Sequence, residues 1–260
     1  MALNPKLTNW NRQRVWIVGA SAGIGAALAT QLLQRGARVA ISARSRPALD
    51  LLAEKFPADR AYVLPLDVSD VAQIQAAHQA LASAWGGYDL VIYCAGHYAP
   101  QRAWDLSLST VQQMFAVNVN GVYACLTIVV PQLMVQASGG IAIVSSVAGY
   151  SGLPKGLVYG ATKAALINLC EALYLDLAPK GIGVYLIDPG FVRTRLTAQN
   201  DFPMPALMEV DDAAHEIIKG LQRGQFEIHF PKRFSLALKF LRMLPYRWYF
   251  SLVGDRKSVV

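Results

Sequence analysis

The fold is decided by one stretch near the N-terminus, Val15-Trp16-Ile17-Val18-Gly19-Ala20-Ser21-Ala22-Gly23-Ile24-Gly25. An apolar run of strand length enters a glycine cluster, after which Ile24, Leu28 and Leu32 recur at helical spacing as far as Gly36. Glycines at such a junction let the backbone turn tightly and approach a pyrophosphate, at which the helix directs its positive N-terminus. An ordinary strand–helix turn would show the same glycines, but their place at the start of a βαβ unit favours a dinucleotide site.

Apolar segments of strand length alternate with segments of helical period along the rest of the chain. We expect strands at 15–18, 38–43, 62–66, 90–94, 141–144, 184–187 and 226–230, and helices at 24–35, 48–56, 72–85, 111–135 and 159–177. This alternation predicts an α/β fold with a doubly wound parallel sheet in a single domain. The domain is expected to cover residues 1–233, with a substrate lid near 191–215 that includes an irregular loop at 195–210. Residues 234–260 are expected to form a basic, aromatic C-terminal extension.

The composition limits the classes of partner that the chain is expected to bind. Its 260 residues are 54% hydrophobic and 16% charged, and the whole net charge of +7 arises after Ile218. A neutral body argues against a nucleic-acid-binding surface spread over the fold. Cys94, Cys125 and Cys170 lie in apolar stretches, which favours reduced thiols over a disulfide or a metal site, and the histidines show no metal-ligand spacing. The N-terminus shows no apolar run of signal-peptide length, so a cytoplasmic protein is expected.

The end of the second expected strand, Ala43-Arg44-Ser45-Arg46, predicts which dinucleotide binds. In sheets that bind NAD, an acidic residue at this strand end accepts the ribose hydroxyls, whereas Arg44 stands here. A guanidinium suits the extra 2′-phosphate of NADP, because it offers fixed donors and positive charge. The alternative is a solvated arginine at a strand end. The sequence therefore predicts NADP(H) as the cofactor.

A second constellation lies in the later half of the chain. Tyr159 and Lys163 are one helical turn apart, so they share one face of the expected helix. Ser146 follows the strand expected at 141–144, and ligands of doubly wound sheets bind at the carboxyl ends of the strands. All three side chains are therefore expected to reach the nicotinamide end of the dinucleotide.

In this order the motifs resemble those of the short-chain dehydrogenase/reductase family, over residues 15–230. The family's glycine motif, active-site asparagine and catalytic set are matched by Gly19, Gly23, Gly25, Asn118, Ser146, Tyr159 and Lys163. The resemblance implies a Rossmann fold and a cofactor site built from Gly19, Ser21, Gly23, Ile24, Gly25, Arg44, Asp67, Val68, Ala95, Gly96, Tyr159, Lys163, Pro189, Gly190, Val192 and Thr194. Val18 and Cys94 depart from the family's usual threonine and asparagine, which affects local support of the backbone rather than the reaction.

The expected reaction explains these residue types. A carbonyl that accepts a hydride develops negative charge on its oxygen, and Tyr159 is the predicted acid/base that supplies the proton. A free tyrosine titrates near pH ~10, so we expect the ammonium of Lys163 to favour the phenolate and to lower the pKa of Tyr159. Ser146 would donate a hydrogen bond to the substrate oxygen. The resemblance adds that Lys163 holds the nicotinamide ribose and that Asn118 holds a water of a proton relay.

The substrate is predicted to be a hydrophobic ketone, aldehyde or secondary alcohol. The candidates for its pocket are all apolar, namely Val147, Leu153, Phe191, Phe202 and Met204. Arg193 and Arg195 lie in the lid and are expected to face outward. His97 and Tyr98 follow the fourth strand, and two interpretations stay open for them: contact with the substrate, or ordinary loop residues.

The C-terminal extension mixes aromatic with basic residues. Lys239, Arg242, Pro245 and Arg247 rule out an ordinary membrane-spanning helix. The same mixture suits a helix lying at a membrane interface, with the protein peripheral at the inner face of a membrane. The alternative is that the extension packs on the domain or on a second subunit.

Two questions remain at the level of the whole chain. Leu166, Leu169, Leu173 and Leu177 form an apolar stripe larger than one sheet-facing side requires, which predicts a homodimer or homotetramer. A non-catalytic NADP(H)-binding regulator or scaffold is the alternative function, and the intact Ser–Tyr–Lys set argues against it. An epimerase or dehydratase is a second alternative, although such relatives usually carry a larger C-terminal substrate domain.

Overall fold

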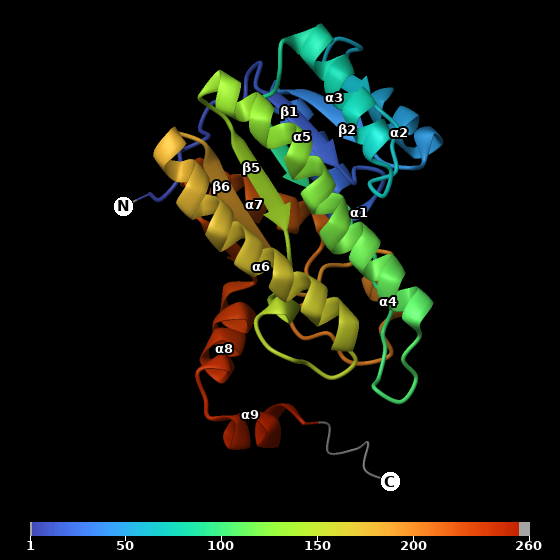
Figure 1. The fold of residues 1–260 in the computed structure, drawn as a ribbon, viewed down its shortest axis with the longest axis vertical. Helices are drawn as coiled ribbons and strands as arrows, with labels where there is room; N and C mark the ends of the chain where they lie inside the picture. The colour runs from blue at the N-terminus through green and yellow to red at the C-terminus, as the bar shows by residue number, and fades with distance from the viewer. Residues whose placement is uncertain (1, 255–260) are drawn as a thin grey trace.

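A computed structural model describes residues 2–254 and shows a seven-stranded sheet with helices on both faces (Figure 1). The strands are β1 (Arg14–Val18), β2 (Arg38–Ser42), β3 (Ala61–Val63), β4 (Leu90–Tyr93), β5 (Gly140–Val144), β6 (Gly183–Pro189) and β7 (Glu227–Phe230). Their order across the sheet is β3-β2-β1-β4-β5-β6-β7, and every neighbouring pair is parallel. The predicted doubly wound α/β fold is confirmed.

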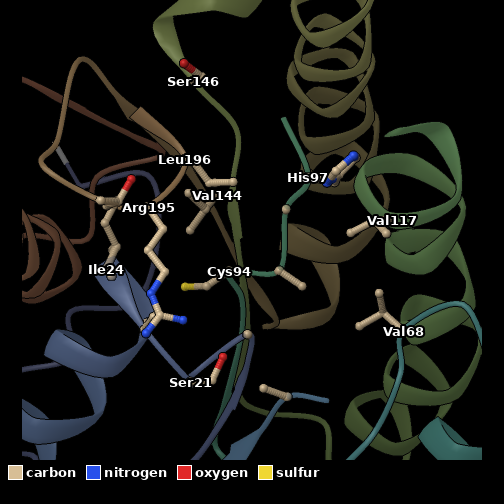
Figure 2. A pocket seen from close by; sticks show the side chains of 18 of the residues that line it. Ser21, Ile24, Val68, Cys94, His97, Val117, Val144, Ser146, Arg195 and Leu196 are labelled. Atoms are coloured by element: carbon tan, nitrogen blue, oxygen red, sulfur yellow. The ribbon is translucent and has the colours of Figure 1, made fainter. Parts of the chain in front are cut away.

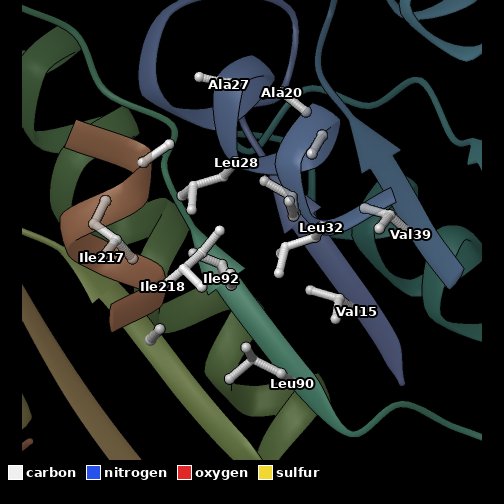
Figure 3. Packing of buried hydrophobic residues seen from close by; sticks show 14 of the residues in the cluster. Val15, Ala20, Ala27, Leu28, Leu32, Val39, Leu90, Ile92, Ile217 and Ile218 are labelled. Carbon is white, nitrogen blue, oxygen red and sulfur yellow. The ribbon is translucent and has the colours of Figure 1, made fainter. Parts of the chain in front are cut away.

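The helices form a layer on each face of the sheet. They are α1 (Gly23–Gln34), α2 (Arg46–Ala53), α3 (Val71–Trp85), α4 (Leu108–Phe115), α5 (Gly121–Gln136), α6 (Leu157–Leu177), α7 (Val210–Gln222), α8 (Lys232–Arg242) and α9 (Tyr246–Val253). One buried cluster joins α1, α2 and α7 to the sheet, and another joins α3, α5 and α6 to its other face. Figure 3 shows the first cluster, with Leu28 and Leu32 of α1 and Ile217 and Ile218 of α7 over the sheet.

β1 illustrates why its sequence is a continuous apolar run. Successive side chains of a strand point to opposite faces, and accordingly Val15 and Ile17 belong to one cluster while Trp16 and Val18 belong to the other. A parallel sheet covered by helices on both faces therefore buries every residue of such a strand. This arrangement fixes β1 at the centre of the molecule.

The strand order positions the ligand site. The chain builds outward from β1 through β2 to β3 and then crosses back to place β4 on the other side of β1. The loops after β1 and β4 therefore leave the sheet in opposite directions, which opens a crevice at the carboxyl ends of these two strands. Both segments that carried the sequence-based prediction, the glycine cluster and the residues after β4, border this crevice.

The structure departs from the expected elements in three places. α7 (Val210–Gln222) was not expected, although Ala213, Ile217 and Leu221 are buried at helical spacing and two acidic residues stabilise its first turn. The expected helix at 111–135 begins at Leu108 and contains a π turn, η1 (Ala116–Asn120), between α4 and α5. The described part of the extension forms two helices, α8 and α9, instead of one.

The helical run Leu108–Gln136 has the length and the mean hydropathy, 1.6, of a membrane-spanning helix. It nevertheless packs on the sheet, because Val122, Cys125, Val129 and Leu133 belong to the buried cluster on that face. We therefore describe it as a core helix.

The three cysteines are free thiols. Cys125 and Cys170 are buried in α5 and α6, and Cys94 is half-buried after β4. Burial raises the pKa of Cys94 and of Cys125 to about 12. Burial also raises the pKa of Cys170 above its ordinary value. The thiols are therefore protonated at neutral pH.

Candidate active site

The crevice at the ends of β1 and β4 has a volume of about 780 Å³ (Figure 2). Its lining contains every residue that the sequence assigned to the cofactor, namely Gly19, Ser21, Gly23, Ile24, Gly25, Arg44, Asp67, Val68, Ala95, Gly96, Tyr159, Lys163, Pro189, Gly190, Val192 and Thr194. Ser146 also lines it, whereas Asn118 is fully buried behind it. Sequence analysis missed Gln113, Ser145, Leu196 and Thr197, which carry no family motif.

The glycine turn between β1 and α1 has no room for side chains. Gly19 has φ +98°, and a Cβ there would lie 2.4 Å from the Ala95 nitrogen. A Cβ on Gly25 would lie 2.1 Å from the Gly19 oxygen. Within the described chain the N-cap of α1, Ala22, makes no side-chain hydrogen bond to the first turn. The turn therefore presents bare backbone at a helix N-terminus, which fits a pyrophosphate.

Two arginines line the crevice. Arg44 follows β2, and its charge acts on the nearby Asp67. Asp67 accepts hydrogen bonds from the Ser69 N–H at 2.9 Å and from the Ser69 hydroxyl at 2.7 Å. These bonds lower the pKa of Asp67, and the charge of Arg44 adds to that effect. Asp67 is thus ionised and already partnered.

Arg195 differs from expectation, because Figure 2 shows its side chain running into the crevice on the side of Ile24 and Ser21. Arg193 does face outward, and its guanidinium pairs with Glu209 at 2.7 Å. The chain bends at Thr194 and turns at Arg195 before η4 (Thr197–Gln199), so the side chains of Arg193 and Arg195 do not share one face as they would in a strand. One lid arginine is therefore available to an anionic ligand in the crevice.

The catalytic candidates Ser146, Tyr159 and Lys163 meet at the end of the crevice opposite the glycine turn. The Ser146 hydroxyl accepts from the Ala148 N–H at 3.1 Å and donates to the Pro189 carbonyl at 3.3 Å. Lys163 donates from Nζ to the Val144 carbonyl at 2.9 Å, and Nζ lies 5.5 Å from the centre of the Tyr159 ring. The three side chains therefore converge from β5, η2 (Val147–Gly149) and α6.

The pKa of Tyr159 moves in the opposite direction from our expectation. Burial raises it to about 12, and the hydrogen-bonding Ser146 only partly opposes this rise. Burial also lowers the pKa of Lys163 to about 8. Desolvation of each side chain outweighs the attraction between a phenolate and an ammonium, because each charged form loses its hydration.

Asn118 lies in the π turn of the long helix and holds the loop after β4. Its Oδ1 accepts from the His97 N–H at 2.7 Å, and its Nδ2 donates to the His97 carbonyl at 2.9 Å and to the Thr162 hydroxyl at 3.1 Å. The extra residue of a π turn displaces a side chain from regular helical register, a feature frequent at functional sites. The side chain of Asn118 is therefore a structural clamp between β4, α5 and α6.

A buried acid that sequence analysis missed lies behind the site. Asp188 in β6 is fully buried, and neither of its oxygens has a hydrogen-bond partner in the described chain. Burial raises the pKa of Asp188 to about 8; the charge of Glu227 adds to the rise, and Lys239 and Lys163 oppose it. Glu227 itself accepts from the Tyr150 hydroxyl at 2.7 Å and pairs with Lys239 of α8.

The substrate side is aromatic. Tyr98 packs edge-on against Tyr159 with ring centres 4.9 Å apart, and its hydroxyl donates to Asn200 at 2.8 Å. This contact places Tyr98 beside Tyr159, the candidate acid/base, and contact of Tyr98 with the substrate stays a prediction. Phe191 packs between Phe202 and Phe234, with ring centres 6.0 and 5.6 Å away.

None of the five apolar residues expected in the substrate pocket lines the crevice, and for two of them the structure shows another environment. Val147 is buried in the core against the sheet, because it follows Ser146 on the opposite side of a tight 3-10 turn. Leu153 lines a separate hollow of about 560 Å³ beyond the crevice, together with Trp104 and Arg242.

The parallel sheet, the glycine turn and the Ser–Tyr–Lys cluster define a dinucleotide-dependent oxidoreductase. The model of the short chain dehydrogenase family matches residues 13–203, and the chain belongs to this family. The resemblance inferred from the sequence is thus confirmed. As a member of this family the protein is an oxidoreductase that uses a nicotinamide dinucleotide.

Known proteins similar to the chain agree with this assignment. An uncharacterised oxidoreductase of Myxococcus xanthus (strain DK1622) is 38% identical over 88% of this chain and 91% of its own length. A short-chain dehydrogenase from Streptomyces avermitilis has a solved structure with a TM-score of 0.82, at 26% identity over 92% of this chain and 96% of its own. A 3-ketoacyl-(acyl-carrier-protein) reductase from Brucella melitensis, complexed with NADH, gives a TM-score of 0.78 at 24% identity over 86% and 99%, which shows the fold alone.

Proposed function

We propose that the protein is an NADP(H)-dependent oxidoreductase that transfers a hydride between the nicotinamide and a hydrophobic ketone, aldehyde or secondary alcohol. One observation carries the proposal: Ser146, Tyr159 and Lys163 line the same crevice as the glycine turn. A non-catalytic dinucleotide-binding protein would need the glycine turn, but it would have no chemical reason to keep the three side chains.

The nicotinamide, when bound, supplies or accepts the hydride, and residues of the chain handle the substrate oxygen. Tyr159 donates its hydroxyl proton to the carbonyl oxygen. Ser146 donates a hydrogen bond to the same oxygen and stabilises its developing charge. Lys163 is one helical turn from Tyr159, where it binds the nicotinamide ribose and restores the proton of Tyr159.

The raised pKa of Tyr159 fixes its protonation state at neutral pH. A hydroxyl with a pKa of about 12 is protonated at neutral pH, which is the form that carbonyl reduction needs. Alcohol oxidation needs the phenolate, so its rate should increase as the pH rises. We therefore propose that Tyr159 is ready to donate its proton to a carbonyl at neutral pH, and that alcohol oxidation accelerates as the pH rises.

The cofactor preference rests on the two arginines of the crevice. β2 is followed by Ala43, Arg44 and Ser45, with no acidic side chain to accept the ribose hydroxyls. Asp67 is the acid near Arg44, and its Oδ1 already accepts both hydrogen bonds from Ser69. Arg44 and Arg195 give the crevice two guanidinium groups for an extra phosphate.

A substrate panel tests the function. Purified protein is mixed with NADPH or NADH and a series of hydrophobic ketones, aldehydes and quinones, and the cofactor absorbance is followed, with alcohols used for the reverse reaction. Turnover of at least one carbonyl with NADPH is expected, and Tyr159→Phe should abolish it. NADPH binding without turnover across the panel would support the regulator or scaffold instead.

A further inference from the structure

The last two described helices leave an apolar face exposed. Seven large side chains on α8 and α9 are each more than half exposed: Leu236, Phe240, Met243, Tyr246, Trp248, Phe250 and Leu252. Leu236 and Phe240 of α8 and Met243 at its C-cap follow a spacing of four and three residues, so they form one stripe. On α9 the Tyr246 and Phe250 rings stack with centres 5.5 Å apart. We call these seven residues the α8–α9 surface.

The opposite sides of the two helices hold them to the body. Tyr249 is buried and its hydroxyl donates to the Gly152 carbonyl at 2.7 Å. Phe234 packs on Phe191, and Lys239 pairs with Glu227. Packing on the domain, the alternative left open by the sequence, therefore accounts for one side of the helices and leaves the α8–α9 surface uncovered.

The exposed charged side chains of α8 and α9 are all basic, and the acid Glu227 lies on the body side, where it pairs with Lys239. The sequence from Ile228 to Gly254 contains five Lys and Arg residues and no Asp or Glu. Arg233, Arg242 and Arg247 are exposed on the same helices. An apolar stripe flanked by cations alone complements an anionic lipid surface, in which rings insert at the headgroup level and guanidinium groups meet phosphates. A protein partner would require acidic side chains for the same complementarity, and a second copy of this surface would bring cations together.

The α8–α9 surface also lies at the same end of the molecule as the opening of the crevice. α8 and α9 extend beyond the carboxyl ends of β5 and β6, the end of the sheet at which the crevice opens (Figure 1). Arg242 shares the second hollow with Trp104, which is itself three-quarters exposed, so the loop before α4 borders the same region. Neither α8, with 11 residues, nor α9, with 8, can span a bilayer, which needs about 20.

We propose that the α8–α9 surface binds the face of an anionic lipid bilayer and holds the crevice close to carbonyl substrates dissolved in the lipid. The identity of those substrates rests on the proposed function, whereas the lipid contact does not. The protein would then lie at the inner face of the membrane without crossing it.

Vesicle co-sedimentation of the full chain tests the contact, without cofactor or substrate. Vesicles of phosphatidylcholine mixed with phosphatidylglycerol should pellet the protein at low salt, and vesicles of phosphatidylcholine alone should pellet much less. Binding should weaken roughly tenfold or more at high salt, because the screening length falls from about 30 Å at 0.01 M to about 3 Å at 1 M. Protein that stays in the supernatant with anionic vesicles at low salt would overturn the proposal.

Paired variants locate the surface. Trp248→Ser with Phe250→Ser, and separately Arg242→Gln with Arg247→Gln, should each weaken binding roughly tenfold or more. Leu51→Ser with Lys55→Gln, exposed on α2 and just after its C-terminal end, is the matched control at the far end of the molecule and should bind as the unmodified protein does. Equal binding by all three variants would contradict the assignment of this surface. If Trp248→Ser with Phe250→Ser instead dissociates an oligomer in light scattering, the surface is an interface between copies and the lipid proposal is wrong.

The two proposals fail separately. Turnover of a water-soluble ketone in the absence of vesicles tests the reaction, and all three paired variants should retain it because none of their residues lines the crevice. Vesicle binding with no turnover would reject the proposed function alone, and turnover with no vesicle binding would reject the lipid contact alone.

Discussion

At the scale of single residues, Tyr159 and Lys163 share one face of α6, yet their proton affinities shift in opposite senses from those that attraction between them would produce. The buried tyrosine keeps its proton more firmly, and the buried lysine releases its proton more easily. Each shift disfavours a charged side chain in a site shielded from water. The spacing of the two residues could be predicted from the sequence, but the depth at which they are buried could not.

Tyr159→Phe removes only the hydroxyl and should lower kcat by about 10²-fold or more, the usual contribution of a general acid. The ring packing on Tyr98 is retained, so the fold and the NADPH affinity should survive. Steady-state kinetics and a fluorescence titration of NADPH measure the two quantities. A variant that keeps a tenth of kcat or more would show that another group donates the proton.

Arg44→Ala should weaken NADPH binding about tenfold, or 1.4 kcal/mol, and leave NADH affinity unchanged, because only NADPH carries the 2′-phosphate. Arg195→Ala should also weaken NADPH binding, since its side chain enters the crevice. Arg193→Ala is the matched control, because this arginine is in the same lid but pairs with Glu209 outside. Equal affinities of the unmodified protein for NADPH and NADH would contradict the cofactor preference.

Asp188 makes stability depend on pH in a defined direction. Its pKa of about 8 in the fold exceeds the ordinary value of 3.8, so the fold retains a proton that the unfolded chain releases. The stability contributed by this proton is complete below about pH 4 and is lost as the pH rises to about 8. Asp188→Asn cannot titrate, so its urea midpoint relative to the unmodified protein should rise between pH 5 and pH 8. A difference that stays constant or falls over that range would contradict a raised pKa.

At the scale of elements, the sequence predicted the helices and strands whose apolar residues follow a clear pattern. It missed those in which polar residues interrupt that pattern. All seven strands were expected, and β4, β5 and β6 had the clearest signal because a strand buried on both faces is a continuous apolar run. α7 was missed because the polar residues of its exposed side interrupt the run, although Ala213, Ile217 and Leu221 keep a helical spacing. Arg195 could not be assigned, since the side that a lid residue faces depends on contacts distant in sequence.

The clamp made by Asn118 is an element-scale feature, because it joins the β4 loop to α5 and α6. Asn118→Ala should cost about 1–3 kcal/mol of stability, since it leaves the part-buried His97 N–H and carbonyl without their partner. Urea unfolding measures this loss. A relay residue with no structural role would instead give lower turnover at unchanged stability, and that result would restore the role implied by the family resemblance.

At the scale of the whole molecule, the leucine stripe of α6 that predicted a dimer packs within the subunit. Leu166, Leu169 and Leu177 are buried and Leu173 packs on the same cluster, so the sheet accounts for the stripe. Exposed apolar side chains remain on the outer sides of α5 and α6, namely Tyr123, Met134, Val135, Leu157 and Leu175. We therefore still expect a homodimer or homotetramer, now through these side chains.

Light scattering at micromolar concentration tests this assembly. Val135→Glu with Leu175→Glu should convert the oligomer to a monomer, because each places a charge in an apolar contact. Leu51→Glu on α2 is the matched control. A monomeric unmodified protein would show that these side chains are simply solvated.

The buried thiols of Cys125 and Cys170 and the half-buried thiol of Cys94 can report which part of the protein opens to solvent. Only a thiolate reacts with an alkylating reagent, so Cys94, Cys125 and Cys170 are shielded both by burial and by their raised pKa values. Alkylation followed by mass spectrometry would therefore count the fraction of molecules open at each place. Cys94 borders the glycine turn, whereas the other two lie inside α5 and α6, so the modification rate of Cys94 relative to theirs separates breathing of the crevice from unfolding of the core.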